Sequence, residues 1–322
     1  MSFYRNAVWF VKGLNEYTKS GYLSASKRFD PADLDVNISN RSFMITGANS
    51  GLGRSAALTI AKKGATVHMV CRNKERGEAA QEELKQESGN QNIHLHLVDM
   101  SKPRDVIRFS ETFKSEGQPL NVLINNAGIL VNEDKRQVTE DGLESTFATN
   151  TLGTHLLTIH LLPVLEQAED PRVVIVTSGG MLLQKLDLSD LQFEKMSKFD
   201  GAMAYSQTKR QQVVMTAQYA KTYPKVHFSC PHPGWSSTPG VQSSLPDFYE
   251  RFQNKLRSEE AGADTIVWLA ISPAATKQLS GLFFQDRKPV PIHLPLAWTK
   301  SNSGDDEKLM TKLQEFAESF NK

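Results

Sequence analysis

Cysteine is nearly absent from this chain of 322 residues, which contains only Cys71 and Cys230. Each of the two ends an apolar run in a different half of the sequence, so the pattern does not indicate a disulfide framework. A reducing compartment fits this pattern best. We expect an intracellular protein, cytoplasmic or peripheral to a membrane. A mitochondrial presequence stays open, because Glu16 is the only acidic residue before Asp30.

Long apolar runs and an excess of charge of either sign are also missing. No run approaches the roughly 20 apolar residues that a membrane-spanning helix needs. The formal net charge is +1 and charged residues make up 23% of the chain, which gives no electrostatic basis for binding nucleic acid. The sequence shows no internal repeat, and its length suits one large domain or two small ones.

The first forty residues are rich in aromatic and basic side chains. Such a segment either contacts a membrane surface or a partner, or packs its aromatics onto the body of the same protein. Both interpretations remain open from the sequence. The apolar residues of this arm are Phe3, Tyr4, Val8, Trp9, Phe10, Val11, Leu14, Tyr17 and Tyr22, and its basic residues are Arg5, Lys12, Lys19, Lys27 and Arg28.

Strand-like and helix-like segments alternate from residue 41 to about residue 285, which predicts βαβ units. We therefore expect one doubly wound α/β domain of the Rossmann type, with a mostly parallel sheet and helices on both faces. An N-terminal arm (1–40) precedes this domain (41–285), and a C-terminal extension with a terminal helix (286–322) follows it. The expected strands are 41–45, 66–71, 93–98, 120–124, 173–176, 226–229 and an edge at 282–284. The expected helices include 56–61, 74–87, 103–116, 139–167, 202–222 and one beyond Asn302, with interruptions of the fourth at Gly153 and Pro163.

A glycine-rich turn, Thr46–Gly53, stands between the first expected strand and helix. Glycines there let a pyrophosphate approach the backbone, and the N–H groups at the start of the helix supply donors and a positive dipole end. Ligands of such sheets bind beyond the carboxyl ends of the strands. The segments that follow the expected strands are 47–53, 71–72, 99–100, 125–128, 177–178 and 231–238.

Arg72 indicates which dinucleotide binds. It lies nineteen residues after Gly53, where an acidic residue often accepts hydrogen bonds from the adenosine ribose. A guanidinium at this position suits a 2′-phosphate instead, and Arg54 offers a second cation. We therefore expect NADP(H) in preference to NAD(H).

Tyr205 and Lys209 form the second chemical pattern. Four residues apart in an expected helix, they share one helix face. A nearby cation favours the phenolate, so it lowers the pKa of the tyrosine toward the range useful for proton transfer. Alone, such a pair is usually ordinary surface; together with an upstream nucleotide-binding turn it gains weight.

In combination, these motifs resemble the classical short-chain dehydrogenase/reductase family over about residues 41–285. The turn has the TGxxxGxG form, Asn125–Gly128 matches the NNAG segment, and Pro233-Gly234 followed by Thr238 matches the segment that closes over nicotinamide. Asp99 stands where an adenine-contacting aspartate is expected. Taken with the strand ends, this gives a cofactor site of Gly47, Asn49, Ser50, Gly51, Leu52, Gly53, Arg54, Arg72, Asp99, Met100, Asn126, Ala127, Gly128, Tyr205, Lys209, Pro233, Gly234 and Thr238.

The resemblance also implies a catalytic tetrad of Asn150, Ser178, Tyr205 and Lys209. In that family's mechanism the tyrosine exchanges a proton with the substrate oxygen and the serine hydrogen-bonds the same oxygen. The lysine holds the nicotinamide ribose, and the asparagine helps to hold a water that links the lysine to solvent. Thr177 is the alternative hydroxyl. No metal is required, and the eight histidines show no ligand pattern.

The 27 residues from Ser178 to Tyr205 exceed the family's usual spacing, so we expect a bulging loop at 179–201. This insertion resembles the retinol-dehydrogenase-like branch, which implies a small lipophilic carbonyl or alcohol as substrate. Residues 241–252 either cover that substrate or make ordinary core contacts. A catalytically quiet nucleotide-binding scaffold is the competing function, and the oligomeric state is open.

Overall fold

The structure, a computed structural model, describes residues 2–131 and 133–321, and a parallel sheet forms its centre. The sheet has eight strands in the order β3-β2-β1-β4-β5-β6-β7-β8. All neighbours pair in parallel except β7 and β8, which are antiparallel. The strands are β1 (Ser42–Thr46), β2 (Thr66–Cys71), β3 (Ile93–Leu97), β4 (Val122–Asn125), β5 (Arg172–Ile175), β6 (His227–His232), β7 (Leu282–Gln285) and β8 (Lys288–Pro289). The strand order reverses between β1 and β4, which is where a doubly wound sheet opens a crevice for its ligand.

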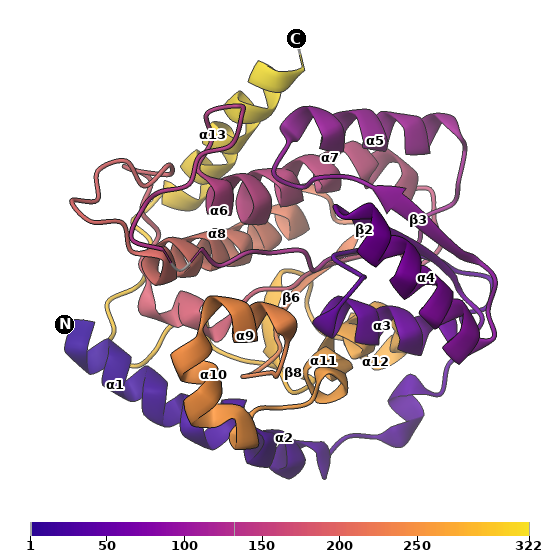
Figure 1. Cartoon of the computed structure of the whole chain (residues 1–322), viewed down its shortest axis with the longest axis horizontal. Coiled ribbons are helices and arrows are strands. Elements are labelled where there is room, and N and C mark those ends of the chain that lie inside the picture. Colours follow the sequence, from indigo (N-terminus) through magenta and orange to yellow (C-terminus); the bar gives the residue numbers. More distant parts are fainter. Residues whose placement is uncertain (1, 132, 322) are drawn as a thin grey trace.

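Helices cover both faces of the sheet, as expected (Figure 1). One face carries α3 (Gly51–Ala61), α4 (Lys74–Ser88), α11 (Glu259–Ile271) and α12 (Pro273–Thr276), which share an apolar core with the inner strands. The other face carries α5 (Pro103–Ser115), α6 (Ser145–Phe147), α7 (Thr154–Leu165) and α8 (Gly201–Thr222). The inner strands are buried on both faces, because helices exclude water from each. The single Rossmann-type domain is thus confirmed.

The helix expected at 139–167 is wrong at its start. Glu144 caps the first turn by accepting a hydrogen bond from the N–H of Phe147 at 2.7 Å, so α6 begins at Ser145. A π-helical segment (Ala148–Gly153) then joins α6 to α7. Gly153 permits close packing, because a Cβ there would overlap the carbonyl oxygen of Met100.

Two strand boundaries also differ from expectation. β6 continues to His232 and includes Pro231. Pro231 lies beyond the end of the ladder with β5, where its carbonyl oxygen accepts a hydrogen bond from the N–H of Thr177 at 3.0 Å, so the ladder with β5 does not need its missing N–H. The expected edge at 282–284 is the seventh strand, and the two-residue β8 adds the outer edge.

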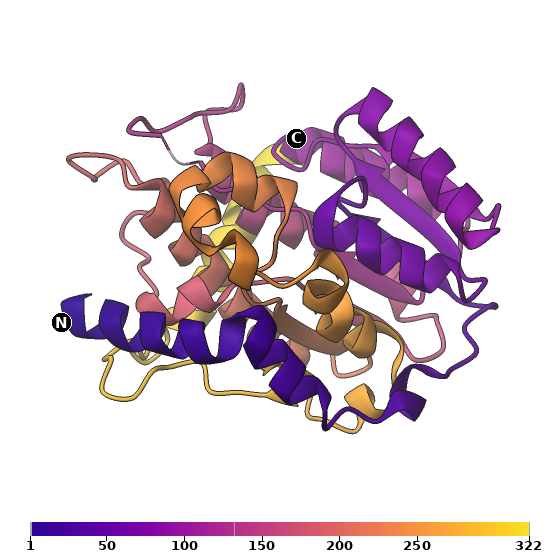
Figure 2. The same cartoon turned by 60° about the horizontal axis from the view of Figure 1, so that its bottom comes forward.

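The N-terminal arm lies along the body of the domain. It consists of α1 (Ser2–Lys12), a π-helical turn (Gly13–Tyr17), α2 (Lys19–Ser26) and a 3-10 turn (Pro31–Leu34). Figure 2 shows α1 running beside α10 (Pro246–Phe252), whose Phe252 packs against Phe10. Tyr17 is fully buried and packs with Trp235, Phe252 and Leu256, so part of the arm's aromatic surface serves the protein's own core.

The C-terminal extension also belongs to the main core. Helix α13 (Asp305–Phe320) buries Leu309, Leu313 and Ala317 among residues of α5, α7 and α8. Of the residues that the structure describes, none forms a helix that is long and apolar enough to cross a membrane.

The expected loop after Ser178 starts with a 3-10 segment (Gly179–Leu183), called η4 below, and continues without regular structure to Asp200. It lies against the loop after β4. The guanidinium of Arg136 donates to the carbonyl oxygen of Gln192 at 2.6 Å and pairs with Glu194 at 3.1 Å. Two long loops thus support each other beside the carboxyl end of the sheet.

Candidate functional site

The glycine turn joins β1 to α3 in a conformation that glycine permits. Gly47 and Gly51 have positive φ angles of 67° and 58°, which side chains rarely adopt. A Cβ on Gly53 would overlap the carbonyl oxygen of Gly47, so this helix start packs tightly against the turn. Ser50 occupies the N-cap position without a side-chain capping bond, which leaves the first N–H groups of α3 to a ligand. These features fit a pyrophosphate.

The NNAG segment holds the glycine turn in place. The hydroxyl of Thr46 accepts hydrogen bonds from the N–H groups of Asn126 and Ala127, both at 2.9 Å. The Asn126 amide donates to the carbonyl oxygen of Thr46 at 2.9 Å. The two cofactor motifs, eighty residues apart in sequence, are therefore one rigid unit.

Thr238 completes this side of the crevice. A Cβ on Gly51 would lie 3.4 Å from Cβ of Thr238, so the segment after β6 reaches the glycine turn. Gly234 in the same segment has a φ of 77° and packs against the guanidinium of Arg257. The expected closing segment thus lies at the expected edge of the sheet.

The two expected cations differ in their surroundings. Arg72 is exposed directly after β2. Arg54 instead pairs with Glu83 at 2.9 Å and with Glu87, both on α4, and is therefore engaged within the protein. Asp99 lies after β3 and accepts hydrogen bonds from Ser101 through one carboxylate oxygen.

Tyr205 and Ser178 meet at the start of α8. The Ser178 side chain lowers the pKa of Tyr205, whereas burial has the larger effect and raises it. Thr177 is turned away, because its hydroxyl donates to the carbonyl oxygen of Lys209 at 2.9 Å. The geometry favours Ser178 over the alternative Thr177.

Lys209 lies beneath Tyr205, with Nζ 5.5 Å from the centre of the phenol ring. Its side chain is 3% exposed, and burial lowers its pKa to about 7. Nζ donates to the carbonyl oxygen of Val176 and to Oε1 of Gln212, each at 3.0 Å. Gly128 closes this pocket, since a Cβ there would lie 3.3 Å from Nζ.

Asn150 is fully buried in the π-helical segment after α6. Its side chain accepts from the N–H of Ile129 at 2.8 Å and donates to the hydroxyl of Thr208 at 3.1 Å. Its main-chain carbonyl accepts from Nε2 of Gln212 at 2.7 Å. Asn150 and Lys209 are therefore connected through the side chain of Gln212.

Gln212 is the residue that sequence reasoning missed. It lies one turn after Lys209 on α8, and this spacing was the signal available. Two hollows lie elsewhere, one of about 340 Å³ between Tyr22 and α11 and one of about 570 Å³ between α8 and α13. None of the four expected catalytic residues lines them.

Comparison with known proteins identifies the family. The family model described as short chain dehydrogenase matches residues 41–186. The chain is 59% identical to dehydrogenase/reductase SDR family member 12 of Bos taurus over 320 residues, covering 99% of this chain and 100% of that one. The chain belongs to the short-chain dehydrogenase/reductase family. It is therefore a member of an oxidoreductase family that acts on CH–OH groups with nicotinamide cofactors.

More distant relatives share the fold or a narrower name. Retinol dehydrogenase 12 of Mus musculus is 32% identical over 258 residues, covering 79% of this chain and 80% of that one. A crystal structure of an uncharacterised protein from Mycobacterium paratuberculosis aligns with a TM-score of 0.67 and 26% identity, covering 86% and 93% of the two chains. A short chain dehydrogenase from Shigella flexneri, complexed with NADP, aligns with a TM-score of 0.61 at 21% identity, over 78% of this chain and 99% of that one.

Proposed function

We propose that this protein is an NADP(H)-dependent oxidoreductase that transfers a hydride between nicotinamide and a lipophilic carbonyl or alcohol. The observation that carries the proposal is the convergence of Tyr205, Ser178 and Lys209 beside a glycine turn built for a pyrophosphate. The bound dinucleotide would supply or accept the hydride. The chain's own residues bind it, orient the substrate and move the proton.

Proton transfer is the task of Tyr205. In the reduction its O–H gives a proton to the carbonyl oxygen while the carbonyl carbon gains the hydride, and in the oxidation the phenolate takes the proton back. Ser178 donates to the same oxygen and fixes its position. Lys209 adds a cation 5.5 Å from the phenol ring, which favours the phenolate. Asn150 holds this lysine through Gln212.

Selection of the 2′-phosphate is assigned to Arg72. Arg72 is exposed at the end of β2. The glycine turn lies next to it, because the N–H of Gly47 donates to the carbonyl oxygen of Val70 on β2 at 2.8 Å. A guanidinium binds a phosphate through two parallel hydrogen bonds. Arg54 is assigned a lesser part, since two glutamates already engage it.

A lipophilic substrate is supported by the relative named retinol dehydrogenase 12. The mutually supporting loops 133–144 and 184–200 lie beside the site and would border the substrate. Phe248 and Phe252, expected either to cover the substrate or to make core contacts, pack on Trp235 and leave this task to the loops.

The test is a cofactor-coupled screen of the full chain with retinoid, steroid and quinone carbonyls, in which NADPH consumption is measured. Tyr205→Phe should abolish turnover while its NADPH affinity stays within about twofold, because the hydroxyl acts on the substrate. Tyr223→Phe, at the opposite end of the same helix and outside the site, is the matched control. NADPH binding without turnover of any compound would instead favour a nucleotide-binding scaffold.

A further inference from the structure

Helix α1 contacts both ends of η4, the segment that begins directly after Ser178. Nε1 of Trp9 donates to the carbonyl oxygen of Gly179 at 2.7 Å. A guanidinium nitrogen of Arg5 donates to the carbonyl oxygen of Leu183 at 2.9 Å. The two donors are four residues apart and so share one face of α1. This face determines where η4 lies relative to the sheet.

Tyr17 supports the same turn through His232. Its fully buried ring meets the imidazole edge to face, with ring centres 4.4 Å apart. Nδ1 of His232 accepts a hydrogen bond from the N–H of Gly179 at 2.9 Å, and burial lowers the pKa of this histidine well below its usual range. A Cβ on Gly179 would lie 3.0 Å from the Tyr17 ring, so the arm and the turn are in direct contact.

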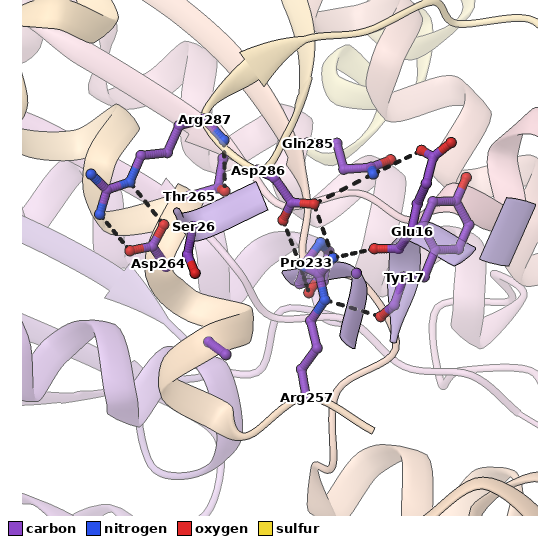
Figure 3. Close-up of polar contacts among 12 residues, drawn as sticks. Glu16, Tyr17, Ser26, Pro233, Arg257, Asp264, Thr265, Gln285, Asp286 and Arg287 are labelled. Atoms are coloured by element: carbon purple, nitrogen blue, oxygen red, sulfur yellow. Dashed lines mark hydrogen bonds and ion pairs between the residues drawn. The ribbon is translucent and has the colours of Figure 1, made fainter. Parts of the chain in front are cut away.

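Arg257 fixes the π-helical turn of the arm to the domain (Figure 3). Its guanidinium donates to the carbonyl oxygens of Tyr17 at 3.0 Å and Glu16 at 2.6 Å, groups that the end of a helix leaves without partners. It also forms a two-bond ion pair with Asp286 at 2.6 and 3.0 Å. With Arg257 only 1% exposed, this attachment is part of the protein's interior.

The arm reaches the cofactor-closing segment as well. The N–H of Trp235 donates to the carbonyl oxygen of Tyr17 at 2.8 Å. The indole of Trp235 lies on Gly13, where any side chain would overlap it. Trp235 leads directly to Thr238, which contacts the glycine turn at Gly51. One continuous series of contacts therefore links the arm to both halves of the site.

We propose that residues 2–26 of the N-terminal arm are a structural part of the active site and that Trp9 is a positioning residue for Ser178. Trp9 and Arg5 hold η4, at whose N-cap Ser178 stands, and Tyr17 holds the segment that leads to Thr238. The family model begins at residue 41, so this support is added from outside the matched region. The inference rests on the proposed function for the role of Ser178 itself.

Trp9→Phe in the full chain tests the proposal, because phenylalanine keeps the ring and removes the indole N–H. Its first readout needs no substrate: ultraviolet difference titration against the matching Tyr205→Phe variant gives the pKa of Tyr205, with and without NADP+. Since the Ser178 side chain lowers that pKa, a displaced Ser178 should raise it. With a substrate from the screen, kcat should fall about tenfold while the Kd for NADPH changes less than about twofold.

Trp268→Phe is the matched control. Its indole N–H also bonds the arm, donating to Asp33 at 2.7 Å, but from α11, beside α3. It should leave the pKa of Tyr205 and kcat unchanged. Arg5→Met provides a second variant if Trp9→Phe does not fold, and it should shift the pKa of Tyr205 in the same direction.

Two results would overturn the inference. One is an unchanged pKa of Tyr205 and an unchanged kcat in the folded Trp9→Phe or Arg5→Met protein. The other is an equal change in Trp268→Phe, which would indicate a general loss of stability. A wild-type protein that turns over no compound contradicts the proposed function alone, because the titration still reports whether the arm positions Ser178.

Discussion

Lys209 Nζ donates a 3.0 Å hydrogen bond to Oε1 of Gln212, one turn further along α8. The same amide donates through Nε2 to the main-chain carbonyl of Asn150 at 2.7 Å. A single side chain thus joins two residues of the proposed tetrad. Both atoms of the amide are satisfied in one orientation, which fixes the buried ammonium relative to Tyr205.

Gln212→Leu should lower kcat about tenfold or more. Leucine leaves the buried carbonyl of Asn150 without its donor and the Lys209 ammonium with one acceptor fewer, each a loss of about 1–3 kcal/mol. Steady-state kinetics with NADPH in excess would measure the effect. Gln218→Leu is the control on the same helix, since Gln218 Nε2 is buried without a hydrogen bond in the described chain. Equal activity of Gln212→Leu and wild type would show that the bridge has no catalytic effect.

Because Lys209 is buried, its effect on the free energy of unfolding should depend on pH. Its pKa in the folded state is about 7, below the ordinary value of 10.5, because burial disfavours the ammonium. The unfolded chain therefore binds more protons between these two values, so this residue's destabilising effect is full below pH 7 and decreases as the pH rises toward 10.5. Lys209→Met should therefore have a higher free energy of unfolding than the wild type at pH 7. This difference should become smaller between pH 7 and pH 10.

The measurement for Lys209→Met is urea unfolding of both cofactor-free proteins at several pH values. The expected change in the difference is about 1–4 kcal/mol, from 1.36 kcal/mol for each unit of pKa shift with allowance for relaxation. Lys221→Met, on the exposed end of α8, is the control. A difference that stays constant with pH would mean that Lys209 keeps its ordinary pKa in the folded protein.

Arg72→Ala should reduce the affinity for NADPH about tenfold to a hundredfold and leave the affinity for NADH unchanged. A charge-assisted hydrogen bond to the 2′-phosphate contributes about 1.5–3 kcal/mol. Arg54→Ala should have a smaller effect, because Glu83 and Glu87 engage its guanidinium. Fluorescence titration with each nucleotide provides the comparison. Equal affinities for both nucleotides in the wild type would remove the basis for a 2′-phosphate site.

Gly53→Ala should abolish NADPH binding and destabilise the fold by about 1–3 kcal/mol. Its Cβ would overlap the carbonyl oxygen of Gly47 and lie 2.5 Å from Nδ2 of Asn126, neither of which can move freely. Gly240→Ala is the control near a helix start, since its Cβ would meet only Thr238 Oγ1, at 3.9 Å. Thermal unfolding and nucleotide titration measure the two effects, and normal binding by Gly53→Ala would contradict this account of the turn.

The sequence predicts the parts of this fold that follow from local periodicity and from motifs at strand ends. Thr46–Gly53 and the NNAG segment Asn125–Gly128 lie together because strand ends of a parallel sheet converge at one edge. The interaction of Arg54 with two glutamates and the bridge through Gln212 depend on which helices become neighbours, and such contacts leave no periodic signal. The start of α6 at Ser145 depends on one buried carboxylate, Glu144, which acts as its cap.

The role of the N-terminal arm could not be predicted from the sequence either. Its aromatic pattern is equally compatible with a membrane surface and with the domain's own core. In the structure Tyr17 and Trp9 pack inward, whereas Phe3 is 85% exposed. Removal of the whole arm would therefore disturb the core, so the membrane interpretation needs surface substitutions that spare Tyr17.

Contact with a membrane is best tested at Phe3, Leu296 and Trp298, which are 85%, 76% and 75% exposed. Tyr4 donates to the carbonyl oxygen of Pro295 at 3.2 Å, which brings α1 and this loop together. Changing all three side chains to serine should reduce sedimentation with liposomes at least tenfold. Burial of each apolar side chain in the membrane interface would contribute about 1.5–3 kcal/mol to the binding free energy. Leu279→Ser, at a 76% exposed position elsewhere, is the control. Equal sedimentation of the triple variant and wild type would exclude this surface as a membrane contact.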